Sequence, residues 1–87
     1  MIPEIRPYEN GSSEPNSLHL HTYPKPSDKS VLLSNLSWDV LTDGRKWTHR
    51  RLTVQEPVPS RECALETAKQ FAVEKRIPVI FVEHDDA

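Results

Sequence analysis

An Asp-Gly dipeptide between two strand-like segments limits the fold of this chain more than any other feature. Residues 31–41 are rich in strand-forming side chains and lead directly to Asp43-Gly44, and residues 46–54 follow with aromatic, basic and β-branched side chains. Asp and Gly tolerate the two left-handed backbone positions of a type I′ turn, which joins adjacent antiparallel strands. The sequence therefore predicts a tight β-hairpin with a basic returning strand.

A turn centred on this dipeptide also predicts the register of the hairpin. It places Val40 opposite Trp47 and Trp38 opposite His49. Because side chains alternate along a strand, both tryptophan rings are then expected on one face of the sheet. A one-residue bulge would change this pairing.

One α-helix is predicted by local signals at both of its ends. The Ser60 hydroxyl can accept from a free backbone N–H of the first turn, and Glu62 suits the positive end of the helix dipole. Lys75 and Arg76 suit the negative end, and Pro78 predicts that the helix stops near Arg76. Between these ends, apolar residues recur at helical spacing: Ala64, Leu65, Ala68, Phe71 and Ala72. We expect this face to pack flat against a sheet.

Two further segments read as strands. Residues 17–23 alternate between apolar and polar side chains, and residues 79–82 are apolar throughout. With the hairpin and the helix, they predict an α+β fold: a small antiparallel or mixed sheet of three to four strands packed against one helix. The last strand could pair with the 31–41 strand or extend the other edge, and the sequence does not choose between these orders.

The N-terminal residues predict little regular structure. Five of the eight prolines lie in the first thirty residues, together with Gly11-Ser12-Ser13. We therefore expect a flexible Pro-rich tail over residues 1–16 and a single small domain over residues 17–87.

The apolar strands raise the question of what covers the second face of the sheet. One helix covers one face, yet residues 79–82 would place apolar side chains on both. Three covers are open: the N-terminal segment with Ile2, Ile5 and Tyr8, a second copy of the chain, or a different protein. The second and third of these predict an interaction surface.

Positive charge is concentrated in the hairpin. Residues 31–54 carry four basic and two acidic side chains, whereas the whole chain has a net charge of −2. Basic groups around an aromatic ring can contact phosphates and stack a base. A solvated strand whose charges discourage edge pairing explains the same pattern, and this explanation is favoured. The candidate binding residues are Arg45, Lys46, Trp47, His49, Arg50 and Arg51.

Metal sites and catalysis receive less support from the sequence. His19 and His21 would project from one side of a strand, and His84, Asp85 and Asp86 could join them if the termini meet. No established ligand motif is present, and an exposed histidine pair beside an acidic C-terminus explains the same residues. We expect no metal site, no cofactor and no catalytic residue.

The remaining composition concerns the compartment and the kind of partner. The chain has one cysteine, Cys63, which suits a reducing compartment, and its N-terminus lacks an apolar signal segment. We expect a soluble cytoplasmic protein with no membrane contact. The predicted function is a non-enzymatic interaction domain acting through protein–protein contacts, with a homodimeric regulatory or inhibitory protein as one form. A nucleic-acid-binding module that uses the basic strand is the alternative.

Overall fold

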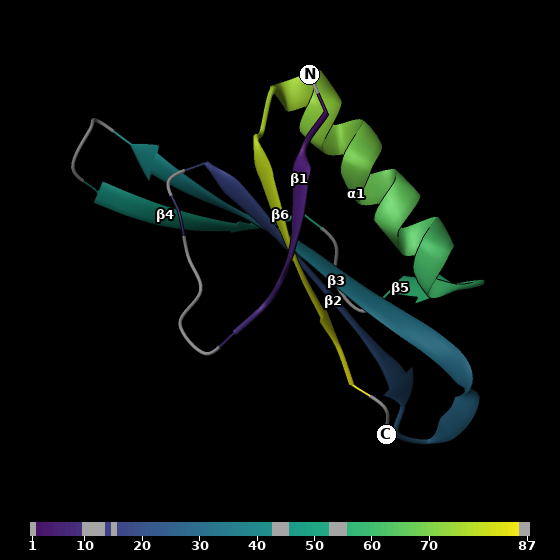
Figure 1. Ribbon diagram of the computed structural model, residues 1–87. Coiled ribbons are helices and arrows are strands. Elements are labelled where there is room, and N and C mark those ends of the chain that lie inside the picture. Colours follow the sequence, from purple (N-terminus) through teal and green to yellow (C-terminus); the bar gives the residue numbers. More distant parts are fainter. Residues whose placement is uncertain (1, 10–13, 15, 43–45, 53–55, 86–87) are drawn as a thin grey trace.

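One helix packs against one side of a mixed β-sheet in the computed structural model (Figure 1). The structure describes residues 2–9, 14, 16–42, 46–52 and 56–85. Its elements are β1 (Glu4–Pro7), β2 (Ser17–Lys25), β3 (Asp28–Thr42), β4 (Lys46–Arg51), β5 (Glu56–Val58), α1 (Arg61–Lys75) and β6 (Val79–His84). The α+β class predicted from the sequence is confirmed.

The sheet contains more strands than the three to four expected. Six strands are paired, in the order β1-β6-β2-β3-β4, with the short β5 added to β3. β6 runs parallel to both of its neighbours, β1 and β2, whereas β2, β4 and β5 are antiparallel to β3. The last strand therefore lies inside the sheet, in neither of the two positions considered from the sequence.

The expected flexible tail is not supported, because β1 lies within it. The backbone N–H of Glu4 donates to the carbonyl of Pro78 at 2.8 Å, and that of Tyr8 donates to the carbonyl of Val82 at 2.9 Å. This pairing covers the edge of β6 that β2 leaves open. Pairing over such a sequence distance leaves no local signal, which is why the prolines alone gave the wrong prediction.

The predicted hairpin is confirmed as β3 and β4, but its register is wrong by one residue. Thr42 pairs with Lys46, so Leu41 lies opposite Trp47 and Trp38 opposite Arg50. Three residues separate the paired ends instead of two, and the shift removes the basis for placing both tryptophans on one face. The predicted Asp43-Gly44 turn lies outside the described residues.

The helix begins and ends at the predicted signals. The Ser60 side chain accepts from the Cys63 N–H, and Arg76 adopts a left-handed conformation with φ of 57° at the C-cap. Ala64, Ala68 and Ala72 are buried against the sheet. Their small side chains allow α1 to approach the strands closely, because each places only a methyl group between the two layers.

The core lies between α1 and the even-numbered side chains of β2, β3 and β6. Its buried members on these strands are Leu18, Leu20, Leu36 and Ile80, joined by Ile77 after the helix. Trp38 packs at its margin and meets Phe71 edge-on, with ring centroids 5.7 Å apart. The alternation predicted for residues 17–23 is therefore confirmed, and it leaves the odd-numbered side chains on the other face.

That other face, which we call the open face, is not covered by the N-terminal apolar residues that the sequence offered. Ile2 is 94 % exposed and Ile5 is 41 % exposed, so neither serves as a cover. Tyr8 alone of that group lies on the open face, where it stacks on His19. Val79 and Phe81, which point to this side, are nevertheless buried.

Within the described part of the chain, no helix combines the length and the apolar character that a membrane span requires.

Candidate functional site

A row of rings runs along β2 on the open face. Tyr8 stacks on His19 with centroids 4.1 Å apart, and the nearly parallel rings of His19 and His21 are 6.3 Å apart. Tyr23 continues the row at 4.9 Å from His21. We call Tyr8, His19, His21 and Tyr23 the ring ladder. Three of its rings come from one strand because side chains two residues apart share a face.

The stacking decides which part of each imidazole is available to a ligand. His19 is flanked by parallel rings on both sides, so its ring faces are turned toward neighbours. Its nitrogen atoms lie at the ring edge, where hydrogen bonds and metal bonds form. The ladder is therefore better suited to polar recognition at the ring edges than to stacking of a nucleic-acid base.

Each ladder histidine faces a carboxylate from the C-terminal end of β6. The His19 Nε2 lies 3.0 Å from the Glu83 Oε1, and the His21 Nε2 lies 2.8 Å from the Asp85 Oδ2. The parallel register places Glu83 directly beside His21, and the Asp85 N–H donates to the Thr22 carbonyl at 3.0 Å. We call His19, His21, Glu83 and Asp85 the histidine–carboxylate cluster.

The environment of His19 holds its imidazole toward the neutral form. Burial disfavours the charged ring and lowers the pKa of His19, and the positive form of His21 would lower it further. The carboxylates of Glu83 and Asp39 act in the opposite direction but do not outweigh burial. The contact between His19 and Glu83 is therefore a hydrogen bond that the neutral ring donates from Nε2 to the carboxylate.

A small polar hollow adjoins the cluster on the side of β3 and β4. It has a volume of about 150 Å³ and is lined by His19, His21, Asn35, Ser37 and Arg51. Arg51 reaches it because it pairs with Ser37, whose side chain shares the open face. The structure thus brings Arg51 close to His19 and His21. The sequence analysis had assigned Arg51 to one feature and the two histidines to another.

Arg51 is the one candidate of the basic strand whose side chain the structure describes, and it is exposed. β4 contains the backbone of four further candidates, but the structure does not describe their side chains: Lys46, Trp47, His49 and Arg50. Arg45 lies outside the described residues altogether. The basic strand as a single surface therefore stays a prediction.

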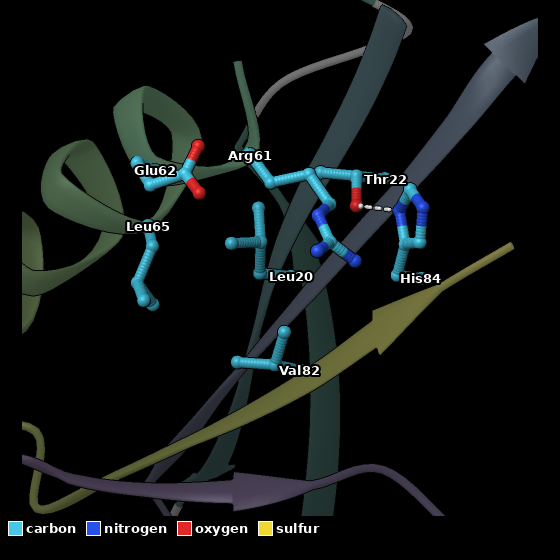
Figure 2. Close-up of a pocket in the computed structure, with 7 residues that line it drawn as sticks. All are labelled: Leu20, Thr22, Arg61, Glu62, Leu65, Val82 and His84. Carbon is cyan, nitrogen blue, oxygen red and sulfur yellow. Dashed lines mark hydrogen bonds between the residues drawn. The ribbon is translucent and has the colours of Figure 1, made fainter. Parts of the chain in front are cut away.

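A second hollow lies on the helix side of the sheet, near the start of α1 (Figure 2). Its volume is about 200 Å³, and Leu20, Leu65 and Val82 form an apolar wall. Thr22 and His84 line another part of it, joined by a 2.8 Å hydrogen bond between Oγ1 and Nδ1. This volume is below the range of about 300–1,000 Å³ of typical ligand pockets, so it suits a side chain of a partner better than a cofactor.

Three large apolar side chains are exposed, two of them before or within β1 and the third on α1. Ile2, Ile5 and Val73 are 94 %, 41 % and 51 % exposed. The bond from Glu4 to Pro78 fixes the start of β1 beside the segment that follows α1. We call Ile2, Ile5 and Val73 the N-terminal apolar edge.

Val73 lies on the outer side of α1, in a group of polar side chains: Glu66, Lys69, Gln70 and Glu74. At 3.6 residues per turn, Val73 is turned away from the stripe of Ala64, Ala68 and Ala72 that is buried against the sheet. Phe71 faces the opposite way, toward Trp38 on β3. Val73 on α1 and Ile5 on β1 are therefore two separate exposed apolar positions.

The backbone of β1 offers little to an added strand. Glu4 and Tyr8 direct their N–H groups to β6, so alternation directs those of Ile5 and residue 7 outward. Pro7 has no N–H, which leaves Ile5 as the outward donor within β1. A partner at this edge must therefore bind through side chains.

Comparison with family models, with curated proteins and with solved structures finds no match for this chain.

The sequence pointed to part of this geometry. His19 and His21 were recognised as sharing a face, and Asp85 was named as a neighbour if the termini met. Tyr8 and Glu83 were missed as site residues. The polar Glu83 after an apolar run was the available signal, since its place two residues beyond Phe81 puts it on the open face. His84, which was grouped with His19 and His21, lies on the other face beside Thr22.

Proposed function

We propose that this chain is a small non-enzymatic interaction domain that acts through protein–protein contacts at the N-terminal apolar edge. The observation that carries the proposal is the exposure of three large apolar side chains, Ile2, Ile5 and Val73. Apolar groups exposed on a small domain favour association, because contact removes them from water. A regulatory or inhibitory protein that blocks a larger assembly is a suitable role for such a domain.

A second copy of the chain is the partner to test first. A two-fold contact would bring the same apolar side chains of two copies together, and a small domain gains proportionally from any added burial. The exposed free thiol of Cys63 suits a reducing compartment, and we place the protein in the cytoplasm on that ground.

Substitution of Val73 tests this surface. We expect wild-type protein to show a concentration-dependent rise toward twice the monomer mass in light scattering, and Val73→Lys to remain monomeric. Thr67→Lys is the matched control, since it adds the same charge at an exposed position of the same helix outside the group of side chains around Val73. Ile5→Lys should act like Val73→Lys, because both place a charge in the apolar contact.

A different protein partner requires a second measurement. If wild type stays monomeric at every concentration, self-association is excluded. A photo-crosslinking residue at position 73 should then capture a discrete partner in cells, whereas the same residue at position 67 should not. Equal products at the two positions, or none at position 73, would remove the support for protein contacts at this edge.

Nucleic-acid binding is the second candidate function, and the position of Arg51 favours it. Arg51 is exposed beside the polar hollow of the open face, and the rest of the basic segment continues along β4. In an NMR titration with short single- and double-stranded oligonucleotides, salt-sensitive shifts should gather over residues 46–51 and weaken in Arg51→Glu. Shifts that are absent, or that are insensitive to salt, would exclude a phosphate-driven mode for these ligands.

A further inference from the structure

The histidine–carboxylate cluster has the composition of a transition-metal site. Its donor atoms are imidazole nitrogens from β2 and carboxylate oxygens from the end of β6, two adjacent parallel strands. One donor atom from each of His21, Glu83 and Asp85 lies within 4.8 Å of the other two. Three donors from two strands of one sheet are therefore already gathered around a common point.

The distances lie close to those of a bound ion. Ligand bonds of about 2.0–2.2 Å to zinc place neighbouring donor atoms of a tetrahedral site about 3.3 Å apart. The His21 Nε2 and the Asp85 Oδ2 are 2.8 Å apart, and the remaining donor lies within the 4.8 Å limit. Side-chain rotations alone can bring these donor–donor distances to the spacing of a tetrahedral site, because each carboxylate lies at the end of a flexible side chain on a fixed backbone.

Hydrogen bonds hold both carboxylate donors in place, one through the backbone and one through a side chain. Thr22, next to His21, accepts from the Asp85 N–H at 3.0 Å, so the segment carrying Asp85 is tied to β2 beyond the last pair of the strands. Glu83 is held by the His19 Nε2 at 3.0 Å. Hydrogen bonds of this kind orient ligands before an ion arrives.

Charge also favours a cation at this point. Glu83 and Asp85 place two carboxylates near one imidazole, and like charges so close repel one another. A divalent ion would remove that repulsion. The exposed Arg51 lines the adjoining hollow together with His21, so its positive charge acts against the two carboxylates there.

We propose that His21, Glu83 and Asp85 form a binding site for a divalent transition-metal ion, for which zinc is the probe, on the open face of the sheet. The imidazole nitrogen selects zinc and related ions over magnesium and calcium, which prefer oxygen donors alone. Three protein ligands leave the fourth tetrahedral position directed to solvent, where His21 and Asp85 are partly exposed. The site lies away from the N-terminal apolar edge and does not depend on protein association.

Calorimetric titration with zinc chloride tests the site directly. Tag-free protein is first stripped of metal with a chelator and then titrated near neutral pH. We expect one zinc ion per chain, and affinity at least about tenfold weaker in His21→Gln and in Asp85→Asn. Magnesium and calcium at the same concentrations should give no comparable signal.

His84→Gln is the matched control. It removes a histidine from the same strand, but one that lies on the helix face beside Thr22, so zinc affinity should stay at the wild-type value. Amide NMR spectra of each metal-free variant establish that the fold is intact. The shifts induced by zinc in wild type should centre on residues 19–22 and 82–85.

Two results would overturn the proposal. One is the absence of zinc binding to folded wild-type protein at millimolar concentration. The other is binding that persists unchanged in folded His21→Gln or Asp85→Asn, which would assign the ion to other surface groups.

Discussion

Asn16 is a single residue that connects three parts of the molecule. Its backbone is left-handed, with φ of 59°, directly before β2. Its Oδ1 accepts from the Trp38 Nε1 at 2.9 Å, and its Nδ2 donates to the Arg76 carbonyl at 3.4 Å. One side chain therefore joins the start of β2, the margin of the core on β3 and the C-cap of α1.

Three substitutions at this position separate its backbone role from its side-chain role. Asn16→Gly keeps the left-handed backbone and loses both hydrogen bonds, and we expect a loss of about 1 kcal/mol in the free energy of unfolding. Asn16→Ala should lose about 1 kcal/mol more, because a Cβ disfavours this conformation when no side-chain bond compensates. Asn16→Asp keeps the acceptor for Trp38 and should fall between wild type and Gly. Urea denaturation measures all three, and wild-type stability in Asn16→Gly would show that the amide contributes nothing.

His19 predicts a pH dependence of stability. Its pKa is lowered in the folded state from 6.5, chiefly by burial, so the unfolded chain binds a proton more readily. The stability that the neutral His19 contributes is therefore fully present above the unfolded pKa. It is lost as the pH falls from there through the lower folded pKa. Glu83 and Asp39 oppose this shift, and His21 adds to it.

The comparison of wild type with His19→Gln isolates this effect from the other titrating groups. In urea denaturation with chelator present, the wild type should lose more stability than the variant between about pH 7.5 and about pH 5.5. An equal loss in both proteins would contradict the role given to His19.

At the scale of the element, β1 is the part of the fold that the sequence analysis assigned incorrectly. Deletion of residues 1–8 removes the hydrogen bonds of Glu4 and Tyr8 to the segment around β6 and uncovers the edge of that strand. We expect a loss of at least about 2 kcal/mol in the free energy of unfolding and a tendency to aggregate, since an uncovered strand edge pairs with other chains.

Deletion of residues 1–2 is the control for this prediction. Ile2 is almost fully exposed and precedes the strand, so its removal should leave the melting temperature close to the wild-type value. If removal of residues 1–8 has equally little effect, the segment behaves as the flexible tail that its prolines predicted.

The elements that the sequence predicted well are those with signals inside themselves. Ser60 and Pro78 marked the ends of α1, and alternation marked β2, because caps and periodicity depend only on near neighbours. The strand order depends on which distant segments meet, and no local signal recorded that β6 lies between β1 and β2. The register of the hairpin was predicted wrongly because its loop is one residue longer than expected. The Asp-Gly signal alone did not decide the length of that loop.

The residues of the candidate site were likewise predictable only where a local signal existed. Alternation along β2 placed His19 and His21 on one face, but their carboxylate partners come from β6 through a parallel pairing. Glu83 became a site residue only when that pairing was known. The basic strand was visible as a charge pattern, and of its members the structure places Arg51 beside the histidines.

For the whole molecule, the topology predicts slow folding for so short a chain. The sheet is complete only when β6 pairs with β1 and β2, which lie far from it in sequence. Closing such distances costs chain entropy before any contact compensates for it. Stopped-flow tryptophan fluorescence should therefore show refolding in about a millisecond to seconds. Relaxation in microseconds would indicate that local contacts of the hairpin and the helix control the rate.

The interior position of β6 has a consequence for synthesis on the ribosome. β2 emerges early, but its neighbour begins at Val79, after roughly fifty further residues. At about 5–20 residues per second, one edge of β2 waits several seconds for its partner strand. Until α1 is synthesised late in that interval, the apolar side chains Leu18 and Leu20, which end in the core, lack the cover of both α1 and β6. The nascent chain is therefore expected to depend on chaperones most strongly before α1 and β6 have been synthesised.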